Sequence, residues 1–216
     1  MPVVHGVSAS PYVRKVRVAL AEKGVQYDQN PVMPFGPNEE YRKISPLGKI
    51  PTYEDDGKFL NDSSVIVAYL EKTKPEPPLY PSDPYEFARA LWFEEYGDSA
   101  IAGAIGGVFI QKIVGPMFLN QPTDQKALDN AWNVECPKVF DYLESQIKAS
   151  EAIAGTRFSI GDIGVATHFV NLGHAGYEVP KDKWPKLAAY IAHQHARPSF
   201  KAIIEEERAL FAGASK

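Results

Sequence analysis

Cysteine is almost absent from this 216-residue chain, and Cys136 has no second cysteine with which to form an internal disulfide. A chain without disulfides is typical of a reducing compartment, so we expect a cytoplasmic location. Cys136 falls on the apolar face of a predicted helix, together with Leu128, Trp132 and Val139. We therefore interpret it as an unreactive thiol in a hydrophobic core.

Long apolar runs and blocks of like charge are missing too. The longest run of small and apolar residues, Ala100 to Ile110, contains three glycines and is too short to cross a bilayer. The N-terminus lacks the charged and apolar segments of a secretory signal. With 23 Lys and Arg against 27 Asp and Glu, the formal net charge is −4, and there is no basic block. Nucleic acids and membranes are therefore not expected as partners.

Histidine is also sparse, with five residues scattered along the chain. His193 and His195 are two residues apart, which puts them on different sides of a helix and argues against a shared metal ion. His168 could line a pocket, but we favour a packed or surface position for it. The sequence thus predicts no metal site.

The composition that remains is ordinary for a globular protein, with 44% apolar and 23% charged residues. Its one unusual stretch is Lys74 to Pro84, which holds five prolines and cannot form regular structure. We therefore predict that residues 75–84 link a first domain, residues 1–74, to a second domain, residues 85–216.

The first domain alternates between strand and helix patterns. The expected elements are a strand (2–5), a helix (11–23), a strand (25–31), a short helix (38–44), two strands (52–54 and 58–60) and a helix that begins at Asp62-Ser63. A right-handed crossover would make the first two strands parallel. The turn Asp55-Asp56-Gly57 predicts that the last two form a hairpin.

The second domain is predicted to be all-helical. The expected helices lie at about 85–113, 124–148, 160–172, 184–195 and 198–211. Pro137 predicts a kink or break in the second of these. Ser159-Ile160-Gly161-Asp162 matches a capping box, and Phe158 with Ile163 could form a hydrophobic staple. If both are buried, a change at Asp162 should harm folding rather than chemistry. We interpret Glu205, Glu206 and Glu207 as a solvated face.

Ser10 lies just before the first predicted helix, with Pro11 at the first helical position. Serine is a preferred N-cap, so Ser10 could serve as a cap and nothing more. The unpaired N–H groups of a helix start also favour negative charge, so this position could bind an anion. Ser8 and Tyr12 are the alternatives to Ser10 in such a site.

Four segments in this order resemble the cytosolic glutathione transferases, in particular their serine-type, theta- and zeta-like branches and members of bacterial appearance. They are Ser-Pro-Tyr-Val-Arg-Lys-Val-Arg from Ser10, Ser-Pro-Leu-Gly-Lys-Ile-Pro from Ser45, Asp-Ser-Ser-Val-Ile from Asp62, and Phe-Ser-Ile-Gly-Asp-Ile from Phe158. The resemblance covers essentially the whole chain. It implies an α/β thioredoxin-like N-terminal domain plus an all-α C-terminal helical domain.

The resemblance also implies that Ser10 hydrogen-bonds the sulfur of glutathione, which would be the co-substrate. A free thiol has a pKa of about 8.5, and lowering it by about two units requires about 2.7 kcal/mol. A hydrogen bond to a charged acceptor supplies roughly 1.5–3 kcal/mol, and a helix N-terminus adds roughly 0.3–1 kcal/mol. Ser10 and its helix are therefore sufficient to form the thiolate.

The same resemblance assigns the glutathione-binding residues. Ile50, followed by a cis Pro51, would pair its backbone with the cysteinyl unit. Ser63 would bind the γ-glutamyl carboxylate and Asp62 the γ-glutamyl ammonium, where the family often has Glu or Gln. Lys49 is a candidate for the glycyl carboxylate.

The second substrate is expected in a pocket completed by the helical domain, and Tyr12, Tyr96, Ser99 and Gly103 are candidates for its wall. Gly103, Gly106 and Gly107 could leave room for an electrophile or a subunit partner, or could simply allow close helix packing. The resemblance implies a homodimer and transfer of glutathione to a small hydrophobic electrophile, as in detoxification. A glutathione-dependent isomerase, a dehalogenase, and a non-catalytic carrier or interaction module remain open.

Overall fold

The computed structural model describes residues 1–36, 38–149 and 151–214. The chain divides into two compact units, the first formed by Met1–Leu79 and Ala202–Lys216 and the second by Tyr80–Lys201. The division thus falls inside the proline-rich segment 75–84 and places the end of the chain with the first unit.

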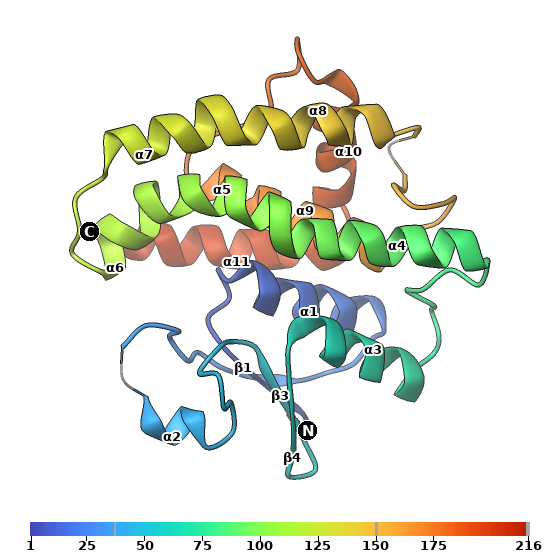
Figure 1. Ribbon diagram of the computed structural model, residues 1–216. Helices are drawn as coiled ribbons and strands as arrows, with labels where there is room; N and C mark the ends of the chain where they lie inside the picture. The colour runs from blue at the N-terminus through green and yellow to red at the C-terminus, as the bar shows by residue number, and fades with distance from the viewer. Residues whose placement is uncertain (37, 150, 215–216) are drawn as a thin grey trace. The chain divides into compact units, whose positions relative to one another are not determined.

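The first unit contains a four-stranded sheet in the order β2-β1-β3-β4 (Figure 1). The strands are β1 (Val3–His5), β2 (Asp28–Asn30), β3 (Thr52–Asp55) and β4 (Lys58–Asn61). β1 is parallel to β2 and antiparallel to β3, and β3 and β4 form a hairpin. The predicted mixed sheet is therefore confirmed, although β2 is shorter than the predicted strand 25–31.

The hairpin turn has the backbone conformation that its sequence indicates. Asp56 and Gly57 have φ values of 50° and 70°, so both lie in the left-handed region. Such a turn twists in the same sense as the strands that it joins, and glycine and aspartate tolerate it better than most residues.

Three helices complete the N-terminal part of the first unit: α1 (Pro11–Glu22), α2 (Glu39–Arg42) and α3 (Ser63–Thr73). Val13, Val16 and Leu20 of α1 are fully buried, as are Ile66 of α3 and Val4 of β1. These residues form the core between sheet and helices, as the helical spacing of the apolar residues predicts.

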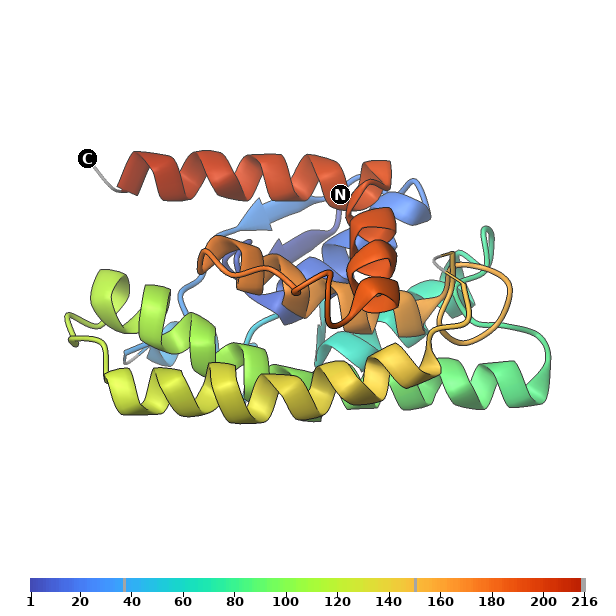
Figure 2. The same ribbon diagram turned by 90° about the horizontal axis from the view of Figure 1, so that it is seen from above.

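The second unit is helical. Its elements are α4 (Pro84–Tyr96), α5 (Ala102–Phe109), α6 (Gly115–Phe118), α7 (Gln125–Asn130), α8 (Cys136–Gln146), α9 (Ile160–His174), α10 (Pro185–His195) and the beginning of α11 (Pro198–Ala214). α9 is buried over residues 160–172 and packs against α4, α5 and α10 (Figures 1 and 2). The all-helical prediction is confirmed.

Two of the predicted long helices contain π-helical turns. Gly97–Ile101 and Ile110–Val114 join α4, α5 and α6, and Ala131–Glu135 joins α7 to α8. The last of these directly precedes Cys136 and Pro137, so the wider turn accommodates the missing N–H of the proline. Pro137 therefore does not end the helix, which continues to Gln146.

The helix from Pro84 to Phe118 is continuous, which corrects the expectation that no segment of the chain is long enough to cross a bilayer. It spans 35 residues, and its most apolar window has a mean hydropathy of 1.5, so it is long and apolar enough to cross a membrane. The shorter run Ala100 to Ile110 did not indicate this. Length and composition do not by themselves show that a helix crosses a membrane, because core helices of soluble proteins share both, and 39% of this window is buried.

Asp162 stabilises the start of α9 from inside the second unit. Its fully buried carboxylate accepts hydrogen bonds from the N–H groups of Ile153 and Ser159 and from the hydroxyls of Ser159 and Tyr190, at 2.8–3.0 Å. The predicted capping box is thus present and buried. Burial raises the pKa of Asp162 to about 6.

Candidate functional site

The predicted site segments meet at one end of the sheet because of strand register. His5, the last residue of β1, lies opposite Thr52, the first residue of β3. Thr52 in turn lies opposite Asn61, the last residue of β4. The loop to Ser10, the Ile50–Pro51 bond and the Asp62-Ser63 helix start therefore all leave the sheet at the same edge (Figure 1).

Ser10 is the N-cap of α1 and is half-buried. Its backbone is extended, and its hydroxyl oxygen accepts the N–H of Val13 at 3.4 Å. Its carbonyl accepts the N–H of Arg14 at 2.9 Å. Because the hydroxyl oxygen serves as the acceptor in this cap, its hydrogen can be donated to a ligand in front of the helix.

Ser8, the alternative to Ser10, already uses its hydroxyl in hydrogen bonds within the first unit. It is buried, its hydroxyl donates to Glu207 Oε1 at 2.8 Å, and its oxygen accepts a hydrogen bond from Arg17. Its only hydroxyl hydrogen is thus already used. The geometry favours Ser10 as the donor toward a ligand.

The Ile50–Pro51 bond is cis, as the resemblance implies. The carbonyl of Lys49 accepts hydrogen bonds from the hydroxyls of Tyr41 and Ser45, at 3.0 and 2.8 Å. Burial raises the pKa of Tyr41, which keeps its phenol a donor. The backbone before Pro51 is thus fixed, while the side chain of Lys49 is exposed.

Gly6 allows the cis-proline loop to approach α1. A Cβ on Gly6 would lie 2.5 Å from Val13 Cγ2 and 3.0 Å from Ile50 Cβ. Gly6 also has a φ of 141°, a conformation that residues with a side chain rarely adopt. Glycine at this position therefore brings the segments around Ser10 and Ile50 together.

The start of α3 combines a helix N-terminus with a buried cation. Asp62 caps the helix, its Oδ1 accepting the N–H groups of Ser64 and Val65 at 2.9 and 3.3 Å. Its φ of 76° is unusual for a residue other than glycine and is the kind of backbone strain found at binding sites. Lys15 is fully buried and donates from Nζ to Ser64 Oγ at 3.0 Å. Ser63, between these groups, is therefore in surroundings that favour an anion.

The candidates for the wall of an electrophile pocket fall in both units. Tyr12 belongs to the first, and Tyr96, Ser99 and Gly103 belong to the second. The Tyr96 ring packs 4.7 Å from that of Tyr142, and Ser99 donates to the Glu95 carbonyl at 2.6 Å. A Cβ on Gly103 would meet nothing within 4 Å, so space is open there. That these residues form one pocket stays a prediction.

Several other predicted side chains are structural. Cys136 is buried, and burial raises its pKa to about 12, so it is an inert core thiol as interpreted. His168 is packed, with Nε2 3.8 Å from Asp98 Oδ1. Among residues 1–36, 38–149 and 151–214, no group of three or more His, Cys, Asp or Glu side chains is arranged to hold a metal ion.

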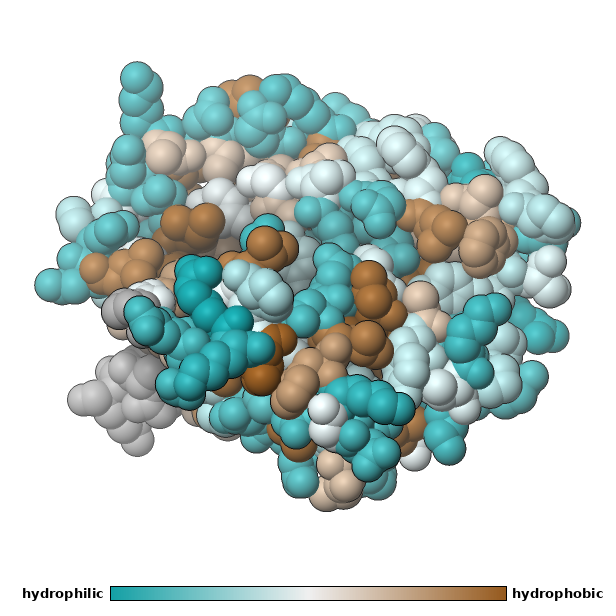
Figure 3. Space-filling model, turned by 60° about the horizontal axis from the view of Figure 1, so that its bottom comes forward, coloured by the Kyte–Doolittle hydropathy of each residue, from teal (hydrophilic) through white to brown (hydrophobic). Residues whose placement is uncertain are grey.

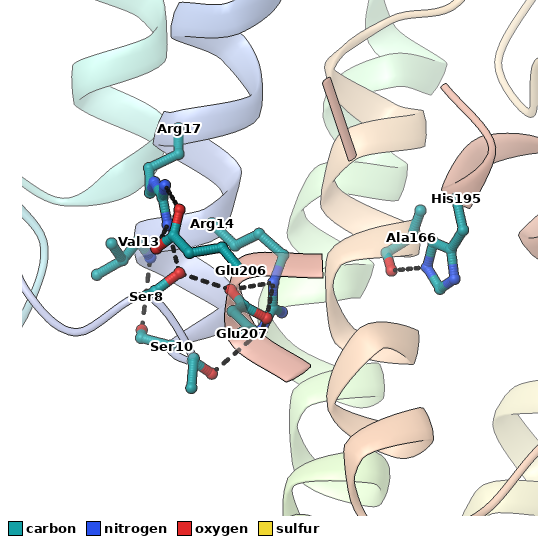
Figure 4. A network of polar contacts seen from close by, with 10 residues as sticks. Ser8, Ser10, Val13, Arg14, Arg17, Ala166, His195, Glu206 and Glu207 are labelled. Carbon is teal, nitrogen blue, oxygen red and sulfur yellow. Dashed lines mark hydrogen bonds and ion pairs between the residues drawn. The ribbon is translucent and has the colours of Figure 1, made fainter. Parts of the chain in front are cut away.

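One functional contribution comes from α11 and is not indicated by the local sequence pattern around it. Glu207 was expected on a solvated face, but it is fully buried and paired with Arg14 (Figure 4). Glu206 pairs with Arg17 at 2.6 Å and is about half exposed. The available signal was that Arg14 and Arg17 fall among the apolar positions of α1, where a buried charge needs a partner.

Comparison with known proteins gives matches along most of the chain. Residues 4–78 match the family model described as glutathione S-transferase, N-terminal domain, and residues 125–193 match the corresponding C-terminal domain. Glutathione S-transferase U4 of Arabidopsis thaliana is 26% identical over 86% of this chain and 80% of its own length.

Two further relatives differ in what their names state. The probable maleylacetoacetate isomerase 1 of Drosophila melanogaster is 38% identical, over 41% of this chain and 38% of the relative. FtsZ-localized protein A of Caulobacter vibrioides is 23% identical over 94% of this chain and 90% of its own.

Solved structures share the fold. A glutathione S-transferase from Rhodospirillum rubrum superposes with a TM-score of 0.85, at 26% identity, over 94% of this chain and 91% of the other. A glutathione S-transferase I bound to lactoylglutathione superposes with a TM-score of 0.82, at 22% identity, over 94% and 98%.

Proposed function

Because the chain belongs to the glutathione S-transferase family, we propose that it binds glutathione at the sheet edge beside Ser10 and transfers it, as the thiolate, to a small hydrophobic electrophile. The observation that carries the proposal is the register His5–Thr52–Asn61, which brings the starts of α1 and α3 and the cis Ile50–Pro51 bond to one edge. Glutathione has a γ-glutamyl carboxylate, a peptide backbone and a sulfur that a site can recognise. The α3 start suits the carboxylate, the segment at Ile50 suits the backbone, and the α1 start suits the sulfur.

The peptide part of glutathione is held by fixed backbone and charge. The N–H and C=O of Ile50 pair with the cysteinyl unit, as an added strand does. The γ-glutamyl carboxylate binds at Ser63, where the α3 N-terminus and the buried Lys15 favour negative charge. Asp62 uses Oδ1 as the cap, and a carboxylate has enough lone pairs for its other oxygen to accept from the γ-glutamyl ammonium. The exposed Lys49 side chain takes the glycyl carboxylate.

The sulfur is activated by Ser10. The thiol proton is released to water, and the Ser10 hydroxyl donates to the resulting thiolate while remaining protonated itself. The thiolate electron pair forms the new bond to carbon. In a displacement the leaving group departs with its bonding pair, and in an addition the resulting carbanion takes a proton from water. The hydrogen bond and the helix together stabilise the thiolate by roughly 2–4 kcal/mol.

The test is Ser10→Ala compared with Ser10→Gly, since glycine retains most of the capping preference. Both variants should bind glutathione in calorimetry, while turnover of a model electrophile falls by about 10- to 100-fold, the equivalent of the lost hydrogen bond. The ultraviolet absorbance of bound thiolate should titrate at a higher pH. Unchanged turnover in both folded variants would remove Ser10 from the mechanism.

Glutathione-dependent isomerisation is a second candidate, and the match to a probable maleylacetoacetate isomerase favours it. In that reaction the thiolate adds to a double bond and leaves again after rotation. Product analysis separates the two activities, because glutathione is recovered unchanged after isomerisation and is consumed by transfer. A dehalogenase would release halide in proportion to glutathione consumed.

A non-catalytic role is the third candidate, and its support is the relative named for a location rather than a reaction. Asp62, Ser63 and the cis Ile50–Pro51 bond argue against it, because an interaction module has no need of a γ-glutamyl site. Calorimetry decides here, since a pure interaction module would bind no glutathione.

A cytoplasmic homodimer with a role in detoxification completes the proposal. Phe59 of β4 and Val65 and Tyr69 of α3 are exposed apolar side chains of the first unit. Figure 3 shows apolar surface interrupted by hydrophilic side chains on the side of the molecule that it presents. Molar mass from light scattering tests for a dimer, and Val65→Asp should shift it toward the monomer.

A further inference from the structure

Glu207, near the end of the chain, forms a dense polar network inside the first unit (Figure 4). Its carboxylate accepts from Arg14 Nε at 3.0 and 3.1 Å and from Arg14 Nη2 at 2.7 Å. It also accepts the Ser8 hydroxyl at 2.8 Å. Both Glu207 and Arg14 are fully buried. Two opposite charges are therefore desolvated and closely paired.

The network is attached to the chain on both sides of Ser10. Ser8, two residues before it, is held by Glu207, and the Ala9 carbonyl accepts from Arg14 Nη2 at 3.4 Å. After Ser10, the Arg14 N–H donates to the Ser10 carbonyl at 2.9 Å, which is the first i→i−4 bond of α1 and joins the Arg14 backbone, not its side chain, to Ser10. Arg14 thus contacts the residue before Ser10 with its side chain and Ser10 itself with its backbone.

An outer pair supports this arrangement. Arg17 donates to the Ser8 oxygen and pairs with Glu206 at 2.6 Å, and it also donates to the Tyr27 hydroxyl at 2.6 Å. Ser8 is therefore fixed as donor and acceptor at once. A single rotamer of Ser8 satisfies both contacts, which limits the conformations of the loop that ends at Ser10.

A buried ion pair usually adds little to the free energy of unfolding. Removing two charges from water costs about as much as their attraction returns, and apolar residues of similar volume often serve equally well. This pair bridges α1 and α11 beside the loop that ends at Ser10, and it is better explained by the geometry that it imposes, because its bonds are directional.

We propose that Arg14, Glu207 and Ser8 are positioning residues, through which α11 holds the Ser10 hydroxyl so that it points at the glutathione sulfur. This inference rests on the proposed function of Ser10. None of the three touches the substrate; they act on the loop that carries the cap. Loosening the loop lets the hydroxyl rotate back onto the helix or into water, so the thiolate loses part of its stabilisation.

Two variants test the inference. Ser8→Ala removes the tether while leaving the ion pair intact. The double change Arg14→Met with Glu207→Leu replaces both members of the pair by apolar side chains, which proteins tolerate better than the removal of one member alone. The matched control is Glu71→Gln, which weakens the ion pair between Glu71 and Lys23 (2.7 Å) at the other end of α1.

The readout is the titration of glutathione thiol in the complex, followed by ultraviolet absorbance, with binding by calorimetry and folding by thermal melting. Both test variants should raise the thiol pKa by about one unit, so that the ratio of thiolate to thiol falls about tenfold at a given pH, with glutathione affinity changed less than about threefold. Glu71→Gln should alter the melting temperature alone. A merely structural role of the network would likewise move only the melting temperature.

A purely electrostatic role gives a different pattern. If the network acted on the sulfur through its charge, Glu207→Gln, which removes one negative charge beside Arg14, would lower the thiol pKa, and the double variant would restore it. The inference is overturned if Ser8→Ala and the double variant are both folded and the glutathione thiol in their complexes has the same pKa as in the wild type. If the double variant does not fold, Ser8→Ala decides. If Ser10→Ala also leaves the thiol pKa unchanged, the proposed role of Ser10 is wrong. If Ser10→Ala raises the thiol pKa but the network variants do not, only the positioning role is wrong, so the two failures can be distinguished.

Discussion

Replacing Asp162 by alanine should destabilise the second unit strongly and in a pH-dependent way. The carboxylate accepts four hydrogen bonds in a fully buried position, two of them from backbone N–H groups. The hydroxyls of Ser159 and Tyr190 can rotate, but the N–H groups of Ile153 and Ser159 cannot. Each backbone donor left without a partner costs about 1–3 kcal/mol. Asp162→Ala should therefore lower the free energy of unfolding by about 2–5 kcal/mol near neutral pH.

The sign of the pH dependence follows from the pKa of Asp162. Burial raises it from 3.8 to about 6, so the folded state binds the proton more tightly than the unfolded state. The stabilising contribution of this group is then complete below the unfolded pKa and is lost as the pH rises through about 6. The difference between wild type and Asp162→Ala should widen by about 1.4 kcal/mol between pH 7.5 and pH 5.

The assay is urea unfolding followed by circular dichroism at the two pH values, with Asp124→Ala as the matched control. Asp124 caps α7 from an exposed position, accepting the Ala127 N–H at 3.1 Å, so its loss should cost only about 1 kcal/mol. Folded Asp162→Ala should still bind glutathione with its original affinity. If the difference in free energy of unfolding between wild type and Asp162→Ala narrows at pH 5, the argument from burial of the carboxylate is refuted. If fully folded Asp162→Ala binds glutathione more weakly than wild type, Asp162 does not act through folding alone.

Two further predictions concern packing and reactivity in the second unit. A Cβ on Gly97 would lie 2.4 Å from the backbone oxygen of Gly164, so Gly97→Ala should lower the free energy of unfolding by about 1–3 kcal/mol. Gly103→Ala meets open space and should be neutral or stabilising by up to about 1 kcal/mol, and denaturant melts of the pair check both values. Cys136, with its pKa raised to about 12, should react with a thiol reagent only when the unit opens, so labelling should accelerate with urea; rapid labelling of native protein would contradict its burial.

Much of this protein can be predicted from short stretches of its sequence, because local rules act within a few residues. The turn at Asp56-Gly57, the caps at Ser10, Asp62 and Ser159 and the alternation of strand and helix all follow from backbone geometry and apolar spacing. The ends of the elements are harder to predict from sequence. β2, for example, is an exposed strand of three residues, which is too short to show an alternation of apolar and polar residues.

Tertiary structure alone decided that Ser8 is bound inside the first unit and that Glu207 is buried. The sequence favours Ser10 as the cap but leaves Ser8 as an alternative in the same loop, and the bond from Ser8 to Glu207, 199 positions away, shows that Ser8 is held inside the first unit. Three consecutive glutamates predict a solvated face, yet Glu207 is buried because Arg14, 193 positions earlier, supplies the compensating charge. Contacts at such separations depend on how the whole first unit folds, and no local propensity encodes them.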